Sequence, residues 1–435
     1  MQPYYFSKSP ISRRSLLKVG ALSPFGINLP SWLKAREANA GGKGSGKNCI
    51  LLWMLGGASQ LDLYDPKPNA PDGVRSIYKP ISTRVPGLQF TELMPNLAAC
   101  ADKLTVIRSM TSLENEHEVG HYFVQSGSFR WNPQAPSLKP PGFGAMADYQ
   151  LGSRGAVPSF VQLGEMLSAS PDAGMAGVLG HRYDPMILNN GRSAQSLGLA
   201  TQPGLDSKRL PQRQQLLSAL ERNRLSGEAD LDRHMARAMD MVTSQKARDA
   251  FDLEKEPVQL RDCYGPGLGQ KMLLARRLVE AGVRFVTVVV FVRHGWDHHP
   301  EIFPRLKDET PPYEKGYAAL LNDLHQRGMM DDTLVLSVGE FGRTPKLNND
   351  PRGPGRDHWN RCFSMTIGGG GVKTGLVFGS SDAQAAYPKD RPVTINEMAH
   401  TIYHVLGMNP QMEYRAADGR PYLALPQGRP ILELL

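Results

Sequence analysis

The chain has 435 residues, of which 40% are hydrophobic and 21% charged, so it can bury a large core like an ordinary globular protein. No apolar stretch reaches the roughly 18 residues of a membrane-spanning helix. The formal net charge is +8, but residues 1–40 hold six basic residues and one acidic residue (+5 net), which leaves +3 for the rest. This small excess gives no case for nucleic-acid binding.

The amino terminus is predicted to be an export signal. The sequence SRRSLLK at residues 12–18 is typical of the twin-arginine motif, and a modest apolar stretch follows it. An A-x-A cleavage site comes next, at residues 38–40. We therefore expect residues 1–40 to be a twin-arginine signal peptide and the mature protein to reach the periplasm or cell envelope.

The four cysteines are far apart and include no CxxC pair, which argues against a thiolate zinc site. In an oxidising compartment they could form one or two disulfides, and buried free thiols are the alternative.

The pattern of apolar runs predicts an α/β fold. We expect strands at residues 49–55, 104–110, 159–163, 284–292, 333–338 and 362–367. Helices are expected at residues 94–100, 268–281, 311–327 and 394–406, the last capped by Thr394 with Glu397. The Pro/Gly-rich residues 131–158 predict a long loop, and amphipathic helices near 205–255 predict a helical insertion. Alternating strands and helices favour a mostly parallel central sheet flanked by helices.

A glycine pair, Gly56-Gly57, directly follows the first predicted strand and lets backbone approach a ligand closely. Neither a dinucleotide fingerprint nor a P-loop is present in the sequence. Ser59, Asp62 and Asp65 are the polar candidates in this segment.

Two histidines, His117 and His121, follow the second predicted strand with the spacing i, i+4, so a helix would place them on one face. The sequence HEVGH also has the HExxH spacing of zinc metalloproteases, and that alternative stays open. Gly120 in the middle of the expected helix speaks against it.

Further polar side chains follow the other strands. The most apolar run, residues 284–292, leads into HGWDHH at 294–299, and the run at 333–338 leads into Glu340. His358 lies on a later loop. Because ligands bind beyond the carboxyl ends of strands in open α/β sheets, these groups predict a metal or acid–base centre. Carboxylates with imidazoles suit Zn²⁺, Mn²⁺ or Fe, whereas carboxylates alone favour Mg²⁺ or Ca²⁺.

The motifs GGxSQLDxxDPKP, HxxGH…SG, GWDHH, GEFGRTP and GRDHW, in this order, resemble the domain-of-unknown-function 1501 family. That family is common in planctomycete-type bacteria and is related to the alkaline phosphatase and sulfatase superfamily. The resemblance covers residues 47–430 and implies an alkaline phosphatase-like domain over residues 41–435. It also implies a metal cluster, with two divalent ions, at the strand ends.

The resemblance assigns the ligands of the two ions residue by residue. One ion is expected at an Asp, a nearby His and a later His, which match Asp297, His298 or His299, and His358. The other is expected at an Asp after the first strand and at an Asp-His pair. Asp62 matches the former, and Glu340 and Phe341 stand where the pair would be.

The nucleophile departs from the superfamily pattern, because His117 stands where a Ser, Thr or Cys is usual. No C-x-P-x-R sequence for formylglycine is present. Our hypothesis is that His117 supplies the imidazole that Phe341 lacks and that a metal-bound water attacks the ester. A histidine nucleophile and a capping or core histidine are the alternatives. Arg343 and Arg356 either clamp an anionic ester oxygen or belong to ion pairs.

The resemblance, together with the predicted export signal, implies an exported metal-dependent hydrolase of phosphate or sulfate esters, in which Zn, Mn, Ca and Mg are not distinguished. Its expected substrate is an anionic ester, such as a sulfated or phosphorylated polysaccharide. The alternative is a non-catalytic relative that binds such a polysaccharide or a partner in the envelope.

Overall fold

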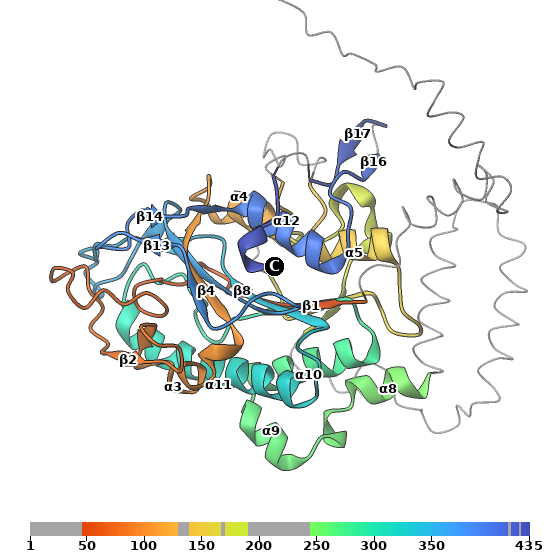
Figure 1. Cartoon of the computed structure of the whole chain (residues 1–435), viewed down its shortest axis with the longest axis horizontal. Coiled ribbons are helices and arrows are strands. Elements are labelled where there is room, and N and C mark those ends of the chain that lie inside the picture. Colours follow the sequence, from red (N-terminus) through yellow and green to blue (C-terminus); the bar gives the residue numbers. More distant parts are fainter. Residues whose placement is uncertain (1–45, 129–138, 167–169, 190–243, 416–418, 426–427) are drawn as a thin grey trace, which may run out of the picture. The chain divides into compact units, whose positions relative to one another are not determined.

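A nine-stranded sheet runs through the molecule, and its strands β4, β8 and β1 are labelled in Figure 1. The strand order is β12-β4-β11-β8-β1-β7-β5-β6, with β15 also paired to β4. The computed structural model describes residues 46–435 except 129–138, 167–169, 190–243, 416–418 and 426–427. The strands of this sheet are β1 Asn48–Trp53, β4 Thr105–Thr111, β5 Phe160–Leu163, β6 Met186–Leu188, β7 Phe285–Val289, β8 Thr333–Val338, β11 Phe363–Gly369, β12 Leu376–Phe378 and β15 Val393–Thr394. Four two-stranded sheets are formed by β2 Pro80–Ser82 with β3 Gln89–Thr91, β9 Gly342–Arg343 with β10 His358–Trp359, β13 Ser380–Ser381 with β14 Pro388–Asp390, and β16 Glu413–Arg415 with β17 Pro421–Leu423.

The sheet is mostly parallel, as predicted. Strand β11 is antiparallel to its neighbours β4 and β8, and the other pairs of this sheet are parallel. The carboxyl ends of β4, β8, β1 and β7 therefore meet at one edge, where the expected ligands follow them.

Helices cover both faces of the sheet. They are α3 Pro95–Ala99, α4 His117–Ser126, α5 Phe143–Leu151, α8 Gln245–Phe251, α9 Val258–Tyr264, α10 Leu268–Ala281, α11 Ile302–Gln326 and α12 Ile395–Leu406. Helices α3, α10 and α11 lie on one face, and α4, α5 and α12 on the other (Figure 1).

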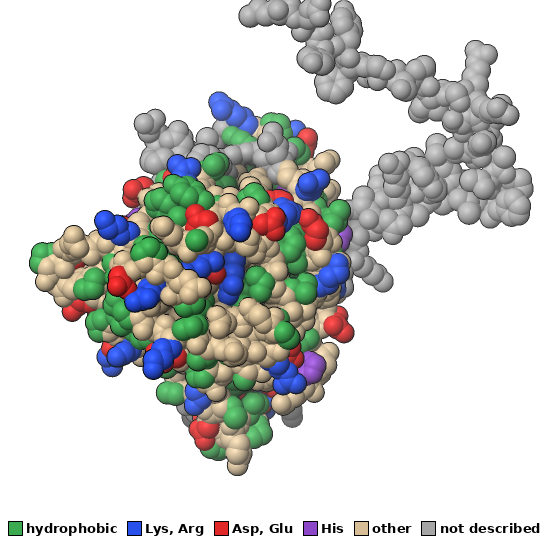
Figure 2. Space-filling view, turned by 60° about the vertical axis from the view of Figure 1, so that its left-hand side comes forward, with side chains coloured by type: hydrophobic (Ala, Val, Ile, Leu, Met, Phe, Trp, Pro, Cys, Tyr) green, Lys and Arg blue, Asp and Glu red, His purple; other side chains and the backbone are tan. Residues whose placement is uncertain are grey.

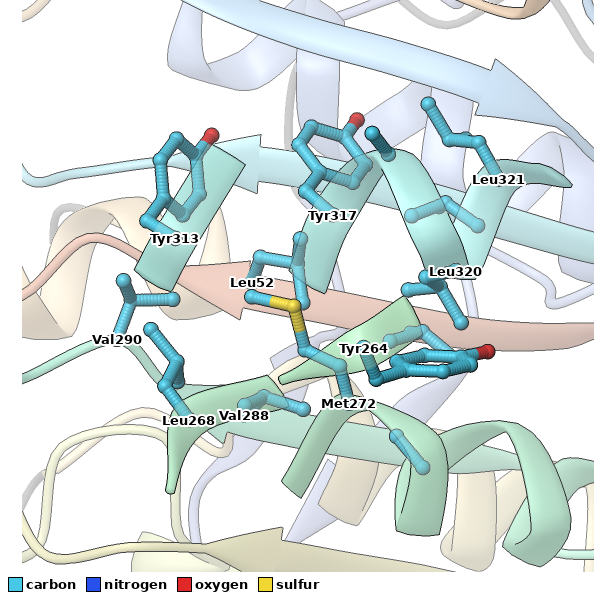
Figure 3. Close-up of a cluster of buried hydrophobic side chains, with 14 of the residues drawn as sticks. Leu52, Tyr264, Leu268, Met272, Val288, Val290, Tyr313, Tyr317, Leu320 and Leu321 are labelled. Atoms are coloured by element: carbon cyan, nitrogen blue, oxygen red, sulfur yellow. The ribbon is translucent and has the colours of Figure 1, made fainter. Parts of the chain in front are cut away.

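Successive residues of a strand point to opposite faces, and β1 shows how this builds two cores. Ile50 and Leu52 pack with α10 and α11, where Met272 and Tyr317 surround Leu52 (Figure 3). Leu51 and Trp53 pack on the other face. Because both faces are covered, all six residues of β1 are buried, which explains its unbroken apolar sequence.

Local sequence signals set several helix ends. Helix α10 has the predicted bounds and ends at Gly282, whose φ of 113° suits glycine. Helix α12 begins at the predicted capping box, in which Thr394 and Glu397 bond each other's backbone N–H groups.

Two helices differ from the prediction. Helix α11 begins at Ile302 and contains Pro311 and Pro312, which made the sequence favour a start at residue 311. The loop predicted at 131–158 is wrong for α5, whose Phe143 and Met146 are buried against the sheet. Packing of apolar side chains thus overrides weak local signals in both places.

The four cysteines are free thiols, and Cys49, Cys100 and Cys362 are buried. Of the two expectations for the cysteines, disulfides or buried free thiols, the structure shows free thiols. Among the described residues, no helix is long and apolar enough to cross a membrane.

Basic and acidic side chains are interspersed on the face shown in Figure 2. Of the insertion predicted near 205–255, residues up to 243 lie outside the described residues, and α8 begins at Gln245.

Candidate metal centre

A first group of potential metal ligands forms around the buried carboxylate of Glu340, in the turn after β8. Its Oε1 lies 2.6 Å from Nδ1 of His117 and 3.0 Å from Nε2 of His121. The backbone N–H of Gly56 also donates to this oxygen, at 3.0 Å. We call His117, His121 and Glu340 the first ligand group; one atom from each lies within 4.8 Å of the others.

Helix α4 can approach Glu340 because position 120 has no side chain. A Cβ atom at Gly120 would lie 3.2 Å from Cβ of Glu340, tighter than ordinary contact. The glycine in the middle of α4 therefore serves close packing, and it does not prevent the helix from forming. His117 and His121 are about one turn of α4 apart, so their side chains lie on the same face of the helix.

A second group lies in the loops after β7 and around β10. Oδ1 of Asp297 lies 3.1 Å from Nε2 of His299 and 3.4 Å from Nε2 of His358. The two imidazole nitrogens are 3.0 Å apart. We call Asp297, His299 and His358 the second ligand group. Three donor atoms this close together suit ligands of one cation with bonds of about 2.0–2.2 Å.

His117 lies between the two groups. Its Nδ1 faces Glu340, and its Nε2 lies 3.3 Å from Oδ2 of Asp297. Its ring packs against Phe341, with 5.0 Å between ring centroids. Burial lowers the pKa of His117, but hydrogen bonds to Asp297 and Glu340 outweigh burial and raise the pKa to about 9. This imidazole thus holds a proton between two carboxylates.

The two carboxylates respond in the opposite direction. Burial raises the pKa of Glu340, but His121 and His117 outweigh it and lower the pKa to about 2. Burial likewise raises the pKa of Asp297, and hydrogen bonds from His117 and His358 with the charge of Arg343 bring it well below its usual range. Both carboxylates are therefore ionised near neutral pH, as metal ligands must be.

The glycine pair after β1 lets these loops meet. Gly56 has φ of 109°, and a Cβ there would lie 2.6 Å from the backbone N of Asp297. Gly57 has φ of 78°, and a Cβ there would lie 2.8 Å from the ring of Phe341. We expected this pair to let backbone approach a ligand closely; in the structure the close approach is instead to the loops that carry Asp297 and Phe341.

Two hydrogen bonds orient the histidines of the second ligand group. Nδ1 of His299 donates to Oδ1 of Asp357 at 2.7 Å, and Nδ1 of His358 lies 2.9 Å from the carbonyl of Asn115. Each bond leaves Nε2 facing the group. This is the usual arrangement for histidines that bind a cation.

Arg343 holds the loops in place from inside. It is fully buried, and its Nε donates to the carbonyl of Gly57 at 2.8 Å. Its guanidinium also donates to the carbonyls of Gly56 and Arg356 and, at 2.6 Å, to Asp297. Because Arg343 is fully buried and four of its N–H groups are already engaged, it contacts Asp297 and the loop carbonyls and does not face the solvent side of the site.

Asp62 lies in a separate buried ion pair. Its Oδ2 accepts from Nε of Arg356 at 2.8 Å and from the hydroxyl of Ser59 at 2.5 Å. Arg356 also donates to the carbonyls of Val74, Thr344 and Pro345. Asp62 therefore belongs to neither ligand group. Of the two roles expected for Arg356, the structure shows the ion pair, and this pair is buried.

The other members of HGWDHH point elsewhere. His298 is 1% exposed, and burial together with the charges of Arg343 and Arg305 lowers its pKa to about 3. It belongs to neither ligand group, so His299 is the partner of Asp297. Trp296 is buried against Tyr313.

His121 has no place in the ligand sets that the family resemblance implies, and it enters the prediction only through the metalloprotease alternative. Its Nε2 contacts Glu340, and its Nδ1 lies 2.6 Å from the hydroxyl of Ser170. Glu118, the acid of the HExxH pattern, is exposed and lies in neither group. The HxxxH spacing was the signal for His121, but its carboxylate partner comes from residue 340.

Comparisons with known proteins give a family and distant structural likenesses. No curated protein matches the chain. Among solved structures, it is similar to the PsFucS1 sulfatase from Pseudoalteromonas sp., with 12% identity, 92% of this chain and 73% of that chain covered, and a TM-score of 0.41. It is similar to the alkaline phosphatase from the Antarctic bacterium TAB5, with 13% identity, 83% and 98% covered, and a TM-score of 0.41.

A further likeness is to the lipoteichoic acid synthase LtaP from Listeria monocytogenes, with 8% identity, 84% and 72% covered, and a TM-score of 0.38. At these values the similarity bears on no residue of the site. The profile of the family described as "Protein of unknown function (DUF1501)" matches residues 46–435. The chain therefore belongs to the DUF1501 family, as its motifs predict.

Proposed function

We propose that this chain is an exported metal-dependent hydrolase of phosphate or sulfate esters, with two divalent cations held by the two ligand groups. One observation carries the proposal: His117 lies between two sets of carboxylate and imidazole groups at the carboxyl ends of a parallel sheet. The motifs that resemble the alkaline phosphatase and sulfatase superfamily supply the reaction class.

The donor atoms fit divalent cations. Oε2 of Glu340 is buried without a hydrogen-bond partner among the described residues, and Nε2 of His117 has only its 3.3 Å contact with Oδ2 of Asp297. An unpartnered carboxylate oxygen is costly inside a protein, and a cation would compensate it. Imidazoles mixed with carboxylates favour Zn²⁺ or Mn²⁺ over Mg²⁺ and Ca²⁺.

Each residue then has a defined part in the reaction. Cations held by the two ligand groups would polarise the ester oxygen and lower the pKa of a nearby water. Both nitrogens of His117 face carboxylates, which leaves neither free to attack an ester and argues against a histidine nucleophile; after losing its proton His117 would serve as a ligand. Arg343 and Asp357 fix Asp297 and His299, so that the second ligand group keeps its geometry while the substrate binds.

Metal analysis and two model esters test this function. The purified protein is expected to contain divalent metal and to hydrolyse p-nitrophenyl phosphate or p-nitrophenyl sulfate, with loss of activity on chelation and recovery on metal addition. The ester that is cleaved faster separates phosphatase from sulfatase chemistry. A folded, metal-replete protein that cleaves neither ester, nor any natural sulfated polysaccharide, would overturn the proposal of catalysis in favour of a binding role.

Export by the twin-arginine route is part of the proposal, and Arg13-Arg14 supports it. Replacing both arginines with lysines is expected to leave the precursor in the cytoplasm, whereas the native signal delivers the mature protein across the membrane. Equal delivery of both forms in cell fractions would exclude this route.

A further inference from the structure

A hollow adjoins the second ligand group and is lined by polar and aromatic side chains. It has a volume of about 490 Å³, and Asp357 and Trp359 form part of its wall. Asp357 also receives the hydrogen bond of His299, so the hollow and the ligand group share this wall. We call it the Trp359 pocket, and its residues used below are Lys346, Asn349, Trp359, Gln384 and Tyr387.

Strand β10 explains why the two sites are neighbours. It consists of His358 and Trp359 and pairs with β9 through His358–Arg343 and Trp359–Gly342. Because adjacent strand residues point to opposite faces, His358 is directed to the ligand group while Trp359 lines the pocket.

The aromatic side chains form a fixed platform. Nε1 of Trp359 donates to the carbonyl of Ala386 at 2.6 Å, which holds its ring. Tyr387 is 53% exposed and meets Trp359 at 5.7 Å between ring centroids, in a T-shaped arrangement. An exposed aromatic ring held by its neighbours loses little conformational entropy when a ligand stacks on it.

The polar side chains of the pocket are available to a ligand. The amides of Asn349 and Gln384 and the ammonium of Lys346 make no hydrogen bond or ion pair within the described part of the chain, and all three residues are exposed. Amides both donate and accept, as hydroxyl groups do. The acid in the wall, Asp357, is already engaged by His299 and Asn348, so Lys346 remains to attract an anion.

A sugar ring matches this combination, because it offers an apolar C–H face to an aromatic ring and hydroxyl groups to amides. We propose that the Trp359 pocket binds the neighbouring sugar of an anionic polysaccharide whose reacting ester lies at the ligand groups. Trp359 and Tyr387 stack on this sugar, and Lys346 pairs with a second anionic group. The inference rests on the proposed function for the position of the reacting ester and extends it to the rest of the substrate.

Calorimetric titration of the metal-loaded full chain tests the pocket without any need for turnover. The probes are hexasaccharides from carrageenan, fucoidan and heparin, their desulfated forms, and adenosine monophosphate. We expect at least one sulfated hexasaccharide to bind more tightly than its desulfated form. Tyr387→Ala and Lys346→Ala are each expected to raise its Kd by roughly three- to tenfold, with metal content and melting temperature unchanged.

Tyr183→Ala and Lys307→Ala serve as matched controls, because neither residue lines the pocket. Equal Kd values in pocket variants and controls, binding of none of the hexasaccharides, or a preference for adenosine monophosphate would overturn the inference. Pocket-dependent binding without hydrolysis of any ester would refute the proposed function alone, whereas ester hydrolysis with pocket-independent binding would refute the inference alone.

Discussion

Metal binding at the two ligand groups is expected to compete with the proton on His117. The pKa of His117 is raised from 6.5 to about 9, which corresponds to a net preference of roughly 3.4 kcal/mol for the protonated form once burial has opposed the two carboxylates. At pH 7 a cation must displace this proton at a cost of about 2.7 kcal/mol. The apparent metal affinity should therefore rise about tenfold per pH unit between pH 7 and pH 9, and level off above.

His117→Ala separates this linkage from other effects of pH. The variant loses a ligand that faces both groups, so its metal affinity at pH 9 should fall by more than about 100-fold, beyond the loss typical of a supporting partner. The tenfold slope between pH 7 and pH 9 should disappear with the imidazole. His181→Ala, which removes an exposed histidine paired with Asp184, serves as the control.

The assay is competition with a chromophoric chelator at pH 7, 8 and 9, using protein stripped of metal. Tighter binding by His117→Ala would show that the imidazole acts as a positive neighbour and not as a ligand. An unchanged slope in the variant would place the linked proton on another group. Either result would refute the reasoning.

Three further predictions concern the frame of the site. Gly56→Ala should destabilise the fold by about 2 kcal/mol or more and weaken metal binding, because its Cβ would meet the backbone of Asp297; Gly73→Ala, where a Cβ meets nothing within 4 Å, should cost less in the same urea titration, and equal costs would count against the close-approach argument. Arg356→Met should lower the free energy of unfolding by about 3–5 kcal/mol by leaving Asp62 buried without its partner, whereas exposed Arg352→Met should change it by less than about 0.5 kcal/mol; a small effect of Arg356→Met would mean that Asp62 is stable without this pair. Burial raises the pKa of Glu309 to about 7, so the folded state holds its proton more tightly than the unfolded state does. The free energy of unfolding should therefore fall by up to about 3 kcal/mol as pH rises from 4.5 to 7, and Glu309→Gln should remove this fall. A difference in unfolding free energy between the native protein and the variant that does not change with pH would refute the prediction.

The fold was predictable where the signal is local. The apolar run of β7 and the capping box of α12 depend on a few neighbouring residues, so sequence suffices for them. The first half of α11 was not predictable from sequence, because Pro311 and Pro312 are unfavourable inside a helix and tertiary packing maintains this helix despite them. The same holds for α5, whose buried face is visible only against the sheet.

The site was predictable to the level of the strand ends and no further. Position after a strand favoured Glu340 and Asp297, and both lie in ligand groups. The partner of Glu340 in His121 comes from a helix 219 residues earlier in the chain, a contact that no local pattern contains. Sequence also does not reveal that Asp62 forms an ion pair with Arg356, because the two residues are 294 positions apart in the chain.

The most direct test of the account is the metal content of the exported protein, measured by mass spectrometry of the element together with its unfolding curve. The two ligand groups predict about two divalent cations per chain, and the loss of both on chelation should lower the melting temperature. A cooperatively folded protein that contains no divalent metal and takes up none on titration would contradict the central claim.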